Sequence, residues 1–426
     1  MLQLRQAPLR RFEPARGWQS PVAIPRRWLA VLFAACALFA LGMGVFSSDD
    51  LHRLWGLFAA GAYLLAAVAV LAWRSARGVD LALILGVGGA LAAPLSVLAE
   101  QGRWQPEVGV IARGARLMVH HGSPYLSDAV VRAAHDPNVY NPYLPVMAVF
   151  GIPRALFGPG LLTDPRVWFC VGFVVIFAAG LAVAGARDVV RWTLLVTATP
   201  VIAFSLAVGG TDVPVLALIC LGLALLWRHP RTVLAGAVLG IAAATKATAW
   251  PALIVAGTMV LVRDGRRAAA RLTAIAVVVA CAIIVPVAAL GAHALVDNTI
   301  LFPLGLASVR SQAASPLPGH VLADTGPTGH LIAVSLLCLA GLGVLVSLVV
   351  RPPRTVPAAT WRLIIGLVLM FTLAPATRFG YFMYPLGLWA WLEIVQLGLR
   401  RGSSARLAGA GPGRSSSSDA TQPSPA

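Results

Sequence analysis

The feature that most constrains this chain is the repetition of apolar runs long enough to cross a lipid bilayer. Such runs recur from Trp28 almost to the C-terminus, each near the length of about 17 to 25 residues that a membrane helix needs. Only 12% of the 426 residues are charged, whereas an ordinary soluble domain has about a quarter. Backbone groups in hydrocarbon must be paired within their own segment. The sequence therefore predicts an all-α polytopic membrane protein, a bundle of about twelve transmembrane helices.

The hydropathy pattern divides the chain into three parts. Residues 1–27 form a basic N-terminus, residues 28–397 the membrane domain, and residues 402–426 a low-complexity tail that we expect to be disordered and cytoplasmic. We expect spans near residues 28–46, 54–73, 79–99, 166–186, 192–209, 212–227, 233–246, 248–262, 270–290, 331–350, 361–375 and 380–397.

The charge distribution predicts the orientation. The net charge is +17, but the arginines are dispersed among short loops between apolar runs, which argues against binding to nucleic acid. Taking the arginine-rich short loops as cytoplasmic places both termini inside the cell. The five cysteines lie within apolar runs and have no CxxC spacing, so we expect them to be buried small hydrophobic residues.

One apolar segment does not fit as a span. Segment 143–158 is short and contains Pro145 and Pro153. Counting it as a membrane crossing would place the downstream arginine loops outside the cell. We therefore predict a re-entrant or interfacial helix at the outer face. Two segments that we assign to the outer side, 100–142 and 291–329, are much longer than the other connections, and loops of this length are usually functional or disordered.

Lys246 is the most informative ionisable residue. It is the single lysine of the chain, whereas every other cation is arginine, and it lies in an apolar stretch before Pro251. A compact ammonium there can bind a phosphate as a point charge, although a lysine at a helix end can also extend to the membrane surface. Asp212 follows Gly209, Gly210 and Thr211, which suits either a ligand site or simple capping of a helix.

The outer segments supply the remaining candidates. Glu107 is a possible general base, and Arg103 suits a phosphate, while Tyr125 follows close behind; a solvated loop has a similar composition. Arg378 precedes Tyr381 and Tyr384, a pattern also found where aromatic residues anchor a protein at the membrane interface. The histidines and acids of the first outer segment match no specific metal spacing. We therefore expect no metal and no cofactor, and no nucleotide loop is present.

These segments, in this order, resemble the GT-C superfamily of polyprenol-phosphate-sugar-dependent glycosyltransferases, and most closely family 87, which includes actinobacterial mannosyltransferases. The resemblance covers about residues 100–400. It rests on Glu107, GSPY at 122–125, VYNPYLP at 139–145, GGTDVPVLAL at 209–218 and GAVLGIAAATKATAWP at 236–251. The family pattern usually has Asp where this chain has Glu107, and this acid follows the third predicted span instead of the first. It usually has Gln and Asn where this chain has Gly210 and Asp212.

The resemblance implies a GT-C-like fold and an activity. The implied activity is transfer of a hexose, with mannose as the candidate, from a polyprenyl-phosphate sugar to a glycolipid or polysaccharide acceptor on the outer face of the plasma membrane. Glu107 is implied as the base. Lys246, Arg103 and Arg378 are implied to hold the donor phosphate, and Asp212 and Tyr125 to line the sugar site. Tyr384 is expected as a further substrate-binding residue. A transporter or lipid flippase and a catalytically inactive assembly partner are the alternatives.

The predicted orientation can be tested by labelling. Cysteines introduced at Ser127 and Ser311 should react with a membrane-impermeant maleimide added outside intact cells, because both positions lie in outer segments under the positive-inside rule. The chain with its five native cysteines is the control. Labelling from the cytoplasmic side alone would contradict the layout.

Overall fold

The computed structural model describes residues 24–409 except Arg74, Ala134, His229, Ser308 and Arg310. The described chain is helical and contains no β-strand, only an isolated bridge between Ala314 and Thr377. Among the described residues, seven helices are long and apolar enough to cross a membrane, or eight if one bent pair counts as a span. The all-α polytopic architecture is thus confirmed, whereas the count of about twelve spans is not. Most of the basic N-terminus and residues 410–426 lie outside the described residues.

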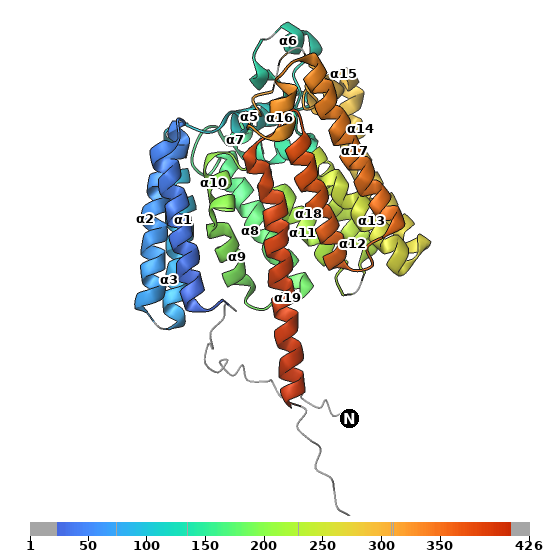
Figure 1. The fold of residues 1–426 in the computed structure, drawn as a ribbon. Helices are drawn as coiled ribbons and strands as arrows, with labels where there is room; N and C mark the ends of the chain where they lie inside the picture. The colour runs from blue at the N-terminus through green and yellow to red at the C-terminus, as the bar shows by residue number, and fades with distance from the viewer. Residues whose placement is uncertain are drawn as a thin grey trace, which may run out of the picture. The chain divides into compact units, whose positions relative to one another are not determined.

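The chain forms two compact units, and the first consists of residues up to 105 together with 190–210. In this unit α1 packs along α2, and α2 packs against α3; these are the blue helices of Figure 1. A π-helical stretch, η1, joins α3 to α4 within one long helix. The bounds are α1 Arg26–Phe46, α2 Asp50–Ala72, α3 Ala76–Val87, η1 Gly88–Ala92, α4 Ala93–Glu100, α9 Val189–Ala198 and α10 Pro200–Val208.

The predicted span 192–209 is not a single straight helix. It breaks between α9 and α10, which meet at an angle of 68°. The residue before a proline is driven out of the helical region by contact with the proline ring. Thr199, which precedes Pro200, accordingly has φ −67° and ψ 146°. The bend is therefore set by the sequence at this position.

The second unit contains residues 106–189 and those from 211 onward. Its membrane helices are joined by pairwise packing of α8 with α11, α12 with α14, α17 with α18, and α18 with α19. Its bounds are α5 Pro106–His121, α6 Asp128–Ala133, η2 Pro137–Val139, η3 Pro145–Gly151, α7 Ile152–Phe157, α8 Pro165–Ala184, α11 Val213–Ala224, α12 Thr232–Ala243, η4 Ala247–Ala249, α13 Trp250–Asp264, α14 Arg266–Leu290, α15 Ala292–Val296, η5 Asp297–Leu301, α16 Pro318–Ala323, α17 Pro327–Val350, α18 Val356–Leu373, η6 Phe379–Phe382 and α19 Met383–Gly409.

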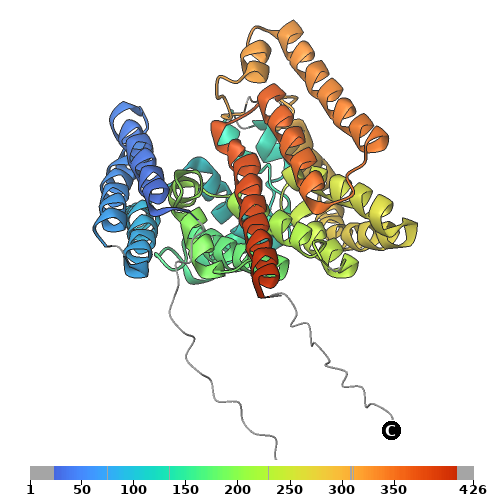
Figure 2. The same ribbon diagram turned by 60° about the horizontal axis from the view of Figure 1, so that its bottom comes forward.

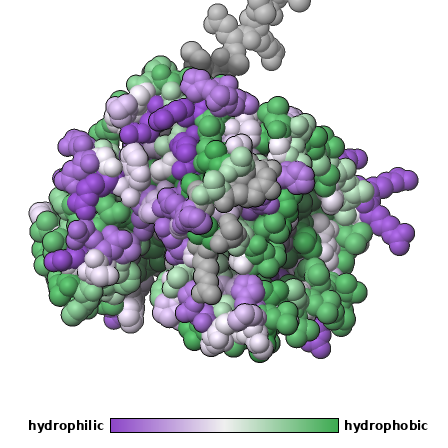
Figure 3. All heavy atoms as spheres, turned by 90° about the horizontal axis from the view of Figure 1, so that it is seen from above, coloured by the Kyte–Doolittle hydropathy of each residue, from purple (hydrophilic) through white to green (hydrophobic). Residues whose placement is uncertain are grey.

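The two segments that we expected as long outer loops both contain helices. The first contains the 16-residue helix α5, and the second contains α15, η5 and α16. Helices α5, α6, α15 and α16 gather at one end of the second unit, at the top of Figure 1. Seen from above, this end exposes many hydrophilic residues (Figure 3). Segment 143–158 forms η3 and α7, a short apolar helix over Pro145–Phe157, which is below the span length; that it does not cross the membrane stays a prediction.

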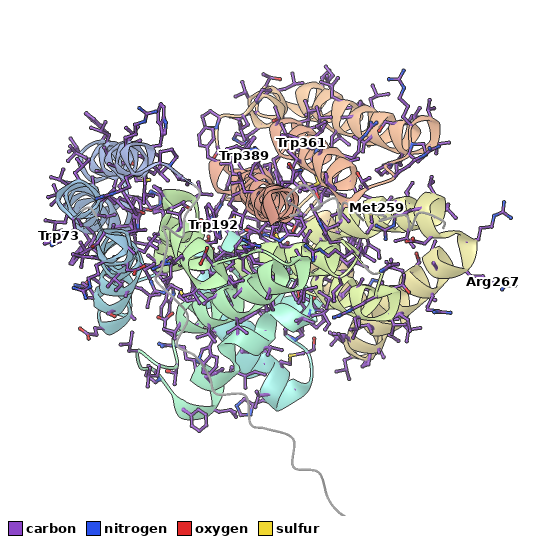
Figure 4. The ribbon with its side chains drawn as sticks, turned by 90° about the horizontal axis from the view of Figure 1, so that it is seen from below. Trp73, Trp192, Met259, Arg267, Trp361 and Trp389 are labelled. Atoms are coloured by element: carbon purple, nitrogen blue, oxygen red, sulfur yellow. The ribbon has the colours of Figure 1, made fainter. Side chains whose placement is uncertain are left out.

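The N-terminal end of α14, which begins at Arg266, is basic. Arg267 extends away from the helix in the view from below (Figure 4), and Arg266 and Arg271 are exposed beside it. Along α14 and α17, large apolar side chains are exposed, among them Val278, Leu331, Leu339 and Val349. Exposed apolar surface on helices of this length is what a bilayer would cover.

Close backbone contact joins α12 to α14, which lie side by side among the yellow helices of Figure 2. A Cβ added at Gly236 would lie 2.5 Å from the Leu272 carbonyl oxygen, and one added at Gly240 would lie 2.6 Å from that of Ala276. Small residues at this spacing let membrane helices approach closely. The packing of the hairpin that carries Lys246 thus depends on these glycines.

Replacing both glycines with alanine should separate α12 from α14. We expect each substitution to cost about 1–3 kcal/mol through overpacking, so the double variant Gly236→Ala/Gly240→Ala should unfold several degrees below the wild type in a thermal-shift assay in detergent. Gly341→Ala on α17 is the matched control, because a Cβ there meets nothing within 4 Å. Equal unfolding temperatures for the double variant and the wild type would contradict the close packing.

Candidate active site

The candidate site lies where several helices of the second unit begin. Glu107 is in the first turn of α5, Asp212 precedes α11, and Arg378 precedes η6. Lys246 lies in the turn between α12 and η4, and Tyr384 lies in the first turn of α19. These five residues were predicted from the sequence as site residues, and the structure brings them together through the contacts described below.

Asp212 and Lys246 form the more deeply buried ion pair of the site. The Lys246 Nζ lies 2.5 Å from Asp212 Oδ1, and the two side chains are only 11% and 14% exposed. The Tyr384 hydroxyl donates to the same carboxylate oxygen at 2.7 Å and lies 2.9 Å from the Thr248 hydroxyl. The Asp212 side chain makes no capping bond to α11, and Lys246 does not extend to the surface. The structure therefore excludes simple capping and simple snorkelling as their roles.

Arg378 and Glu107 form a second ion pair. The Arg378 Nη1 donates to Glu107 Oε1 at 2.9 Å, and the side chains are 32% and 15% exposed. The other carboxylate oxygen, Glu107 Oε2, is buried and has no hydrogen-bond partner among the described residues. Burial of a carboxylate oxygen without a donor is unfavourable. It marks a position where a ligand hydroxyl can donate.

Two tyrosine rings connect the ion pairs. Lys246 Nζ lies 5.2 Å from the centre of the Tyr143 ring and 5.0 Å from that of Tyr381, distances at which a cation is attracted to an aromatic face. Burial alone would lower the pKa of Lys246, but the charge of Asp212, aided by Tyr381 and Glu107, raises it above its ordinary value. The pKa of Arg378 is likewise raised, against the effect of burial, mainly by Glu107. Both cations therefore stay charged.

The backbone around Tyr143 holds these groups in place. Leu144 N donates to Thr245 O at 3.1 Å, and Val146 N donates to Ala244 O at 3.1 Å, which ties the 143–158 segment to the turn of Lys246. The Tyr143 hydroxyl accepts from Thr211 at 3.3 Å. Burial, together with the charges of Glu107 and Asp212, raises the Tyr143 pKa well above its ordinary value, so the phenol stays neutral.

The second outer segment supports Arg378. Thr377 N donates to Ala313 O at 2.8 Å, and Ser315 N donates to Thr377 O at 2.9 Å. The Thr377 hydroxyl donates to Phe371 O at 2.7 Å and is fully buried. These bonds restrict the backbone of Thr377. The direction of the neighbouring Arg378 side chain is therefore fixed by segment 313–315, which lies more than fifty positions earlier in the sequence.

Two predicted site residues are placed differently. Tyr125 is buried behind Tyr143 and donates its hydroxyl to the Tyr143 carbonyl at 2.9 Å, so it positions that residue. Arg103 belongs to the first unit, where it bonds Gln101 at 3.3 Å and lies 4.0 Å from Asp50. Its role towards a phosphate stays a prediction.

Sequence reasoning did not select Tyr143, Tyr381 or Thr248 as site residues. Tyr143 lies within the VYNPYLP segment and Thr248 two positions after Lys246, so proximity to a motif was the available signal. No group of three or more His, Cys, Asp or Glu side chains that could hold a metal is found among the described residues. The cationic side chains in the two ion pairs of this site are Lys246 and Arg378.

Fold and site together define a polytopic membrane protein with a buried cluster of paired charges and tyrosines at one end of its helices. The model of glycosyltransferase family 87 matches residues 141–375, more than half of the chain, and the chain belongs to this family. The predicted resemblance is therefore confirmed, and the protein is a membrane glycosyltransferase by family. The matched region contains Asp212 and Lys246, whereas Glu107 and Arg378 lie on either side of it.

No curated protein matches the chain significantly. Among solved structures, the crystal structure of ArnT from Cupriavidus metallidurans in the apo state is similar, with 19% sequence identity and a TM-score of 0.46. The similarity covers 79% of this chain and 63% of that one.

The buried pair makes a prediction about stability. Asp212→Asn leaves the Lys246 ammonium buried without a carboxylate, and we expect a loss of about 3–5 kcal/mol in unfolding free energy. The double variant Asp212→Asn/Lys246→Met removes both charges, so its unfolding free energy should fall by less than that of Asp212→Asn. Because the folded pKa of Lys246 is raised, the pair contributes fully at neutral pH and loses its contribution only above about pH 10.4. Thermal unfolding in detergent at pH 7 measures the stability of each variant. A double variant less stable than Asp212→Asn would contradict the energetic coupling between Asp212 and Lys246.

Proposed function

We propose that the protein transfers a hexose from a polyprenyl-phosphate sugar to a glycolipid or polysaccharide acceptor. The observation that carries the proposal is the meeting of two cation–carboxylate pairs in one buried site: Lys246 with Asp212, and Arg378 with Glu107. Cations suited to phosphate and a carboxylate suited to accept a proton are the two groups that this reaction requires.

In the proposed reaction the acceptor hydroxyl attacks the anomeric carbon of the donor sugar. The bond between that carbon and the phosphate oxygen breaks, and the oxygen leaves with the phosphate. The phosphate thereby changes from a singly charged diester to a doubly charged monoester. The acceptor proton passes to Glu107, whose unpartnered Oε2 is free to receive it.

The positive groups stabilise the charge that develops on the leaving phosphate. Lys246 and Arg378 are held by the protein before reaction, and preorganised charges in a buried site contribute more than they would in water. Helices α11 and α19 begin next to Asp212 and Tyr384, and helix N-termini carry partial positive charge. Both effects favour an anionic ligand here.

The sugar would lie among polar groups of the same cluster. Asp212 can accept hydrogen bonds from sugar hydroxyls, while Tyr384, Thr248 and Tyr143 offer hydroxyl groups that can donate or accept. Mannose is the sugar that we propose, because the sequence resembles a family that includes mannosyltransferases. We place the reaction on the outer face of the plasma membrane, with both termini cytoplasmic, on the basis of the arginine distribution. The sugar-binding role of Tyr125 stays a prediction.

Membership of a glycosyltransferase family disfavours a transporter or lipid flippase. Whether the protein is instead a catalytically inactive assembly partner is decided by an assay of sugar transfer.

Lys246→Met leaves the Asp212 carboxylate without its cation and should be less stable than the wild type, but it should still fold and insert. At equal amounts of inserted protein, it should reduce transfer from a polyprenyl-phosphate sugar in membranes by at least about 10²-fold, the typical effect of removing one transition-state charge. Lys246→Arg should also be strongly impaired, because a planar guanidinium needs more room than an ammonium beside the two tyrosine rings.

The controls for this assay lie elsewhere in the chain. Arg267→Met removes an exposed cation in the first turn of α14 and should transfer sugar at the wild-type rate. Near-normal turnover by Lys246→Met at equal expression would remove Lys246 from the phosphate site. No turnover by the wild type with any polyprenyl-phosphate hexose would favour the inactive partner.

A further inference from the structure

Both cations of the site are already occupied by carboxylates. The four charged groups, Glu107, Asp212, Lys246 and Arg378, sum to zero, so an arriving phosphate adds a net negative charge. It must compete with a carboxylate for a cation. We infer that the donor phosphate takes Arg378 from Glu107, and that donor binding thereby frees the catalytic base. The inference rests on the proposed function and adds an order of events to it.

The two ion pairs differ in how firmly each is held. Asp212 accepts from both Lys246 and Tyr384, and Lys246 also lies against two tyrosine rings. Glu107 has one bond, to Arg378, and its second oxygen has no partner. The Arg378 side chain is 32% exposed, whereas that of Lys246 is 11% exposed. The pair that can open at least cost is therefore Glu107 with Arg378.

Opening this pair changes the surroundings of Glu107. When a phosphate takes the guanidinium, Glu107 loses the one hydrogen bond that its carboxylate makes among the described residues, and both carboxylate oxygens can then accept from the acceptor hydroxyl. Glu107 would then be fully available as the base only when a donor is bound. The acceptor hydroxyl can meanwhile approach the unpartnered Oε2 from the side away from Arg378.

Competition between Glu107 and the phosphate for Arg378 predicts that replacing Glu107 strengthens phosphate binding while it abolishes turnover. Glu107→Gln leaves Arg378 without its carboxylate, so the purified full-length protein in detergent should bind farnesyl phosphate about 5- to 30-fold more tightly than the wild type, while transfer is lost. Microscale thermophoresis measures the dissociation constant. Glu100→Gln, the same change at an exposed acid, should leave binding unchanged. Unchanged or weaker binding by Glu107→Gln would overturn the inference.

A second variant separates competition for Arg378 from simple relief of charge repulsion. Glu107→Asp keeps the negative charge but shortens the side chain by one methylene, which weakens the bond to Arg378. Tighter binding by this variant as well supports release of the guanidinium. Tighter binding by Glu107→Gln alone shows repulsion only and overturns it. The proposed function fails separately, if Lys246→Met binds farnesyl phosphate as tightly as the wild type.

Discussion

The ion pair between Lys246 and Asp212 is the interaction on which the rest of the site depends. A single charge buried at this depth would be costly, whereas a paired and hydrogen-bonded one is tolerated. Its geometry requires the turn after α12 and the start of α11 to meet, and the Tyr384 hydroxyl adds the start of α19. The same rule appears at Asp164 and Arg166, which are fully buried and bonded to each other at 2.8 Å. That second pair is local to the start of α8, whereas the pair of Lys246 with Asp212 brings the turn after α12 to the start of α11.

The sequence predicted the helical class and the chemically unusual residues, but not all of their partners. Apolar runs of membrane length and a single lysine can be read directly from the sequence. Glu107 and Arg378 are 271 positions apart, and nothing local in either segment predicts that they meet. Tyr143 and Tyr381 were missed because their role comes from rings that lie close to the Lys246 ammonium, and only the fold creates this proximity. The helices within the outer segments were missed because α5 is amphipathic and much less apolar than the spans around it.

The backbone of the site comes largely from short, irregular pieces, and this has a physical reason. Polar backbone groups outside regular helices must find partners one by one. Segment 143–158 finds them in the turn of Lys246, and segment 311–315 finds them beside Thr377. Each irregular piece thus satisfies its own hydrogen bonds by fixing another piece that carries a site residue. Segments 143–158 and 311–315 are in this way part of the site, because the first carries Tyr143 and the second fixes the backbone next to Arg378.

The departures of this chain from the family pattern acquire a meaning in the structure. Where that pattern usually has Asn, this chain has Asp212, whose negative charge offsets that of Lys246. Where the pattern usually has Asp, this chain has Glu107, which bonds Arg378 through one carboxylate oxygen and leaves the other without a partner among the described residues. Each acid therefore neutralises one cation of the site. In the order of binding that we propose, the first change leaves Arg378 as the cation from which a phosphate gains most, and the second supplies the carboxylate that the phosphate displaces.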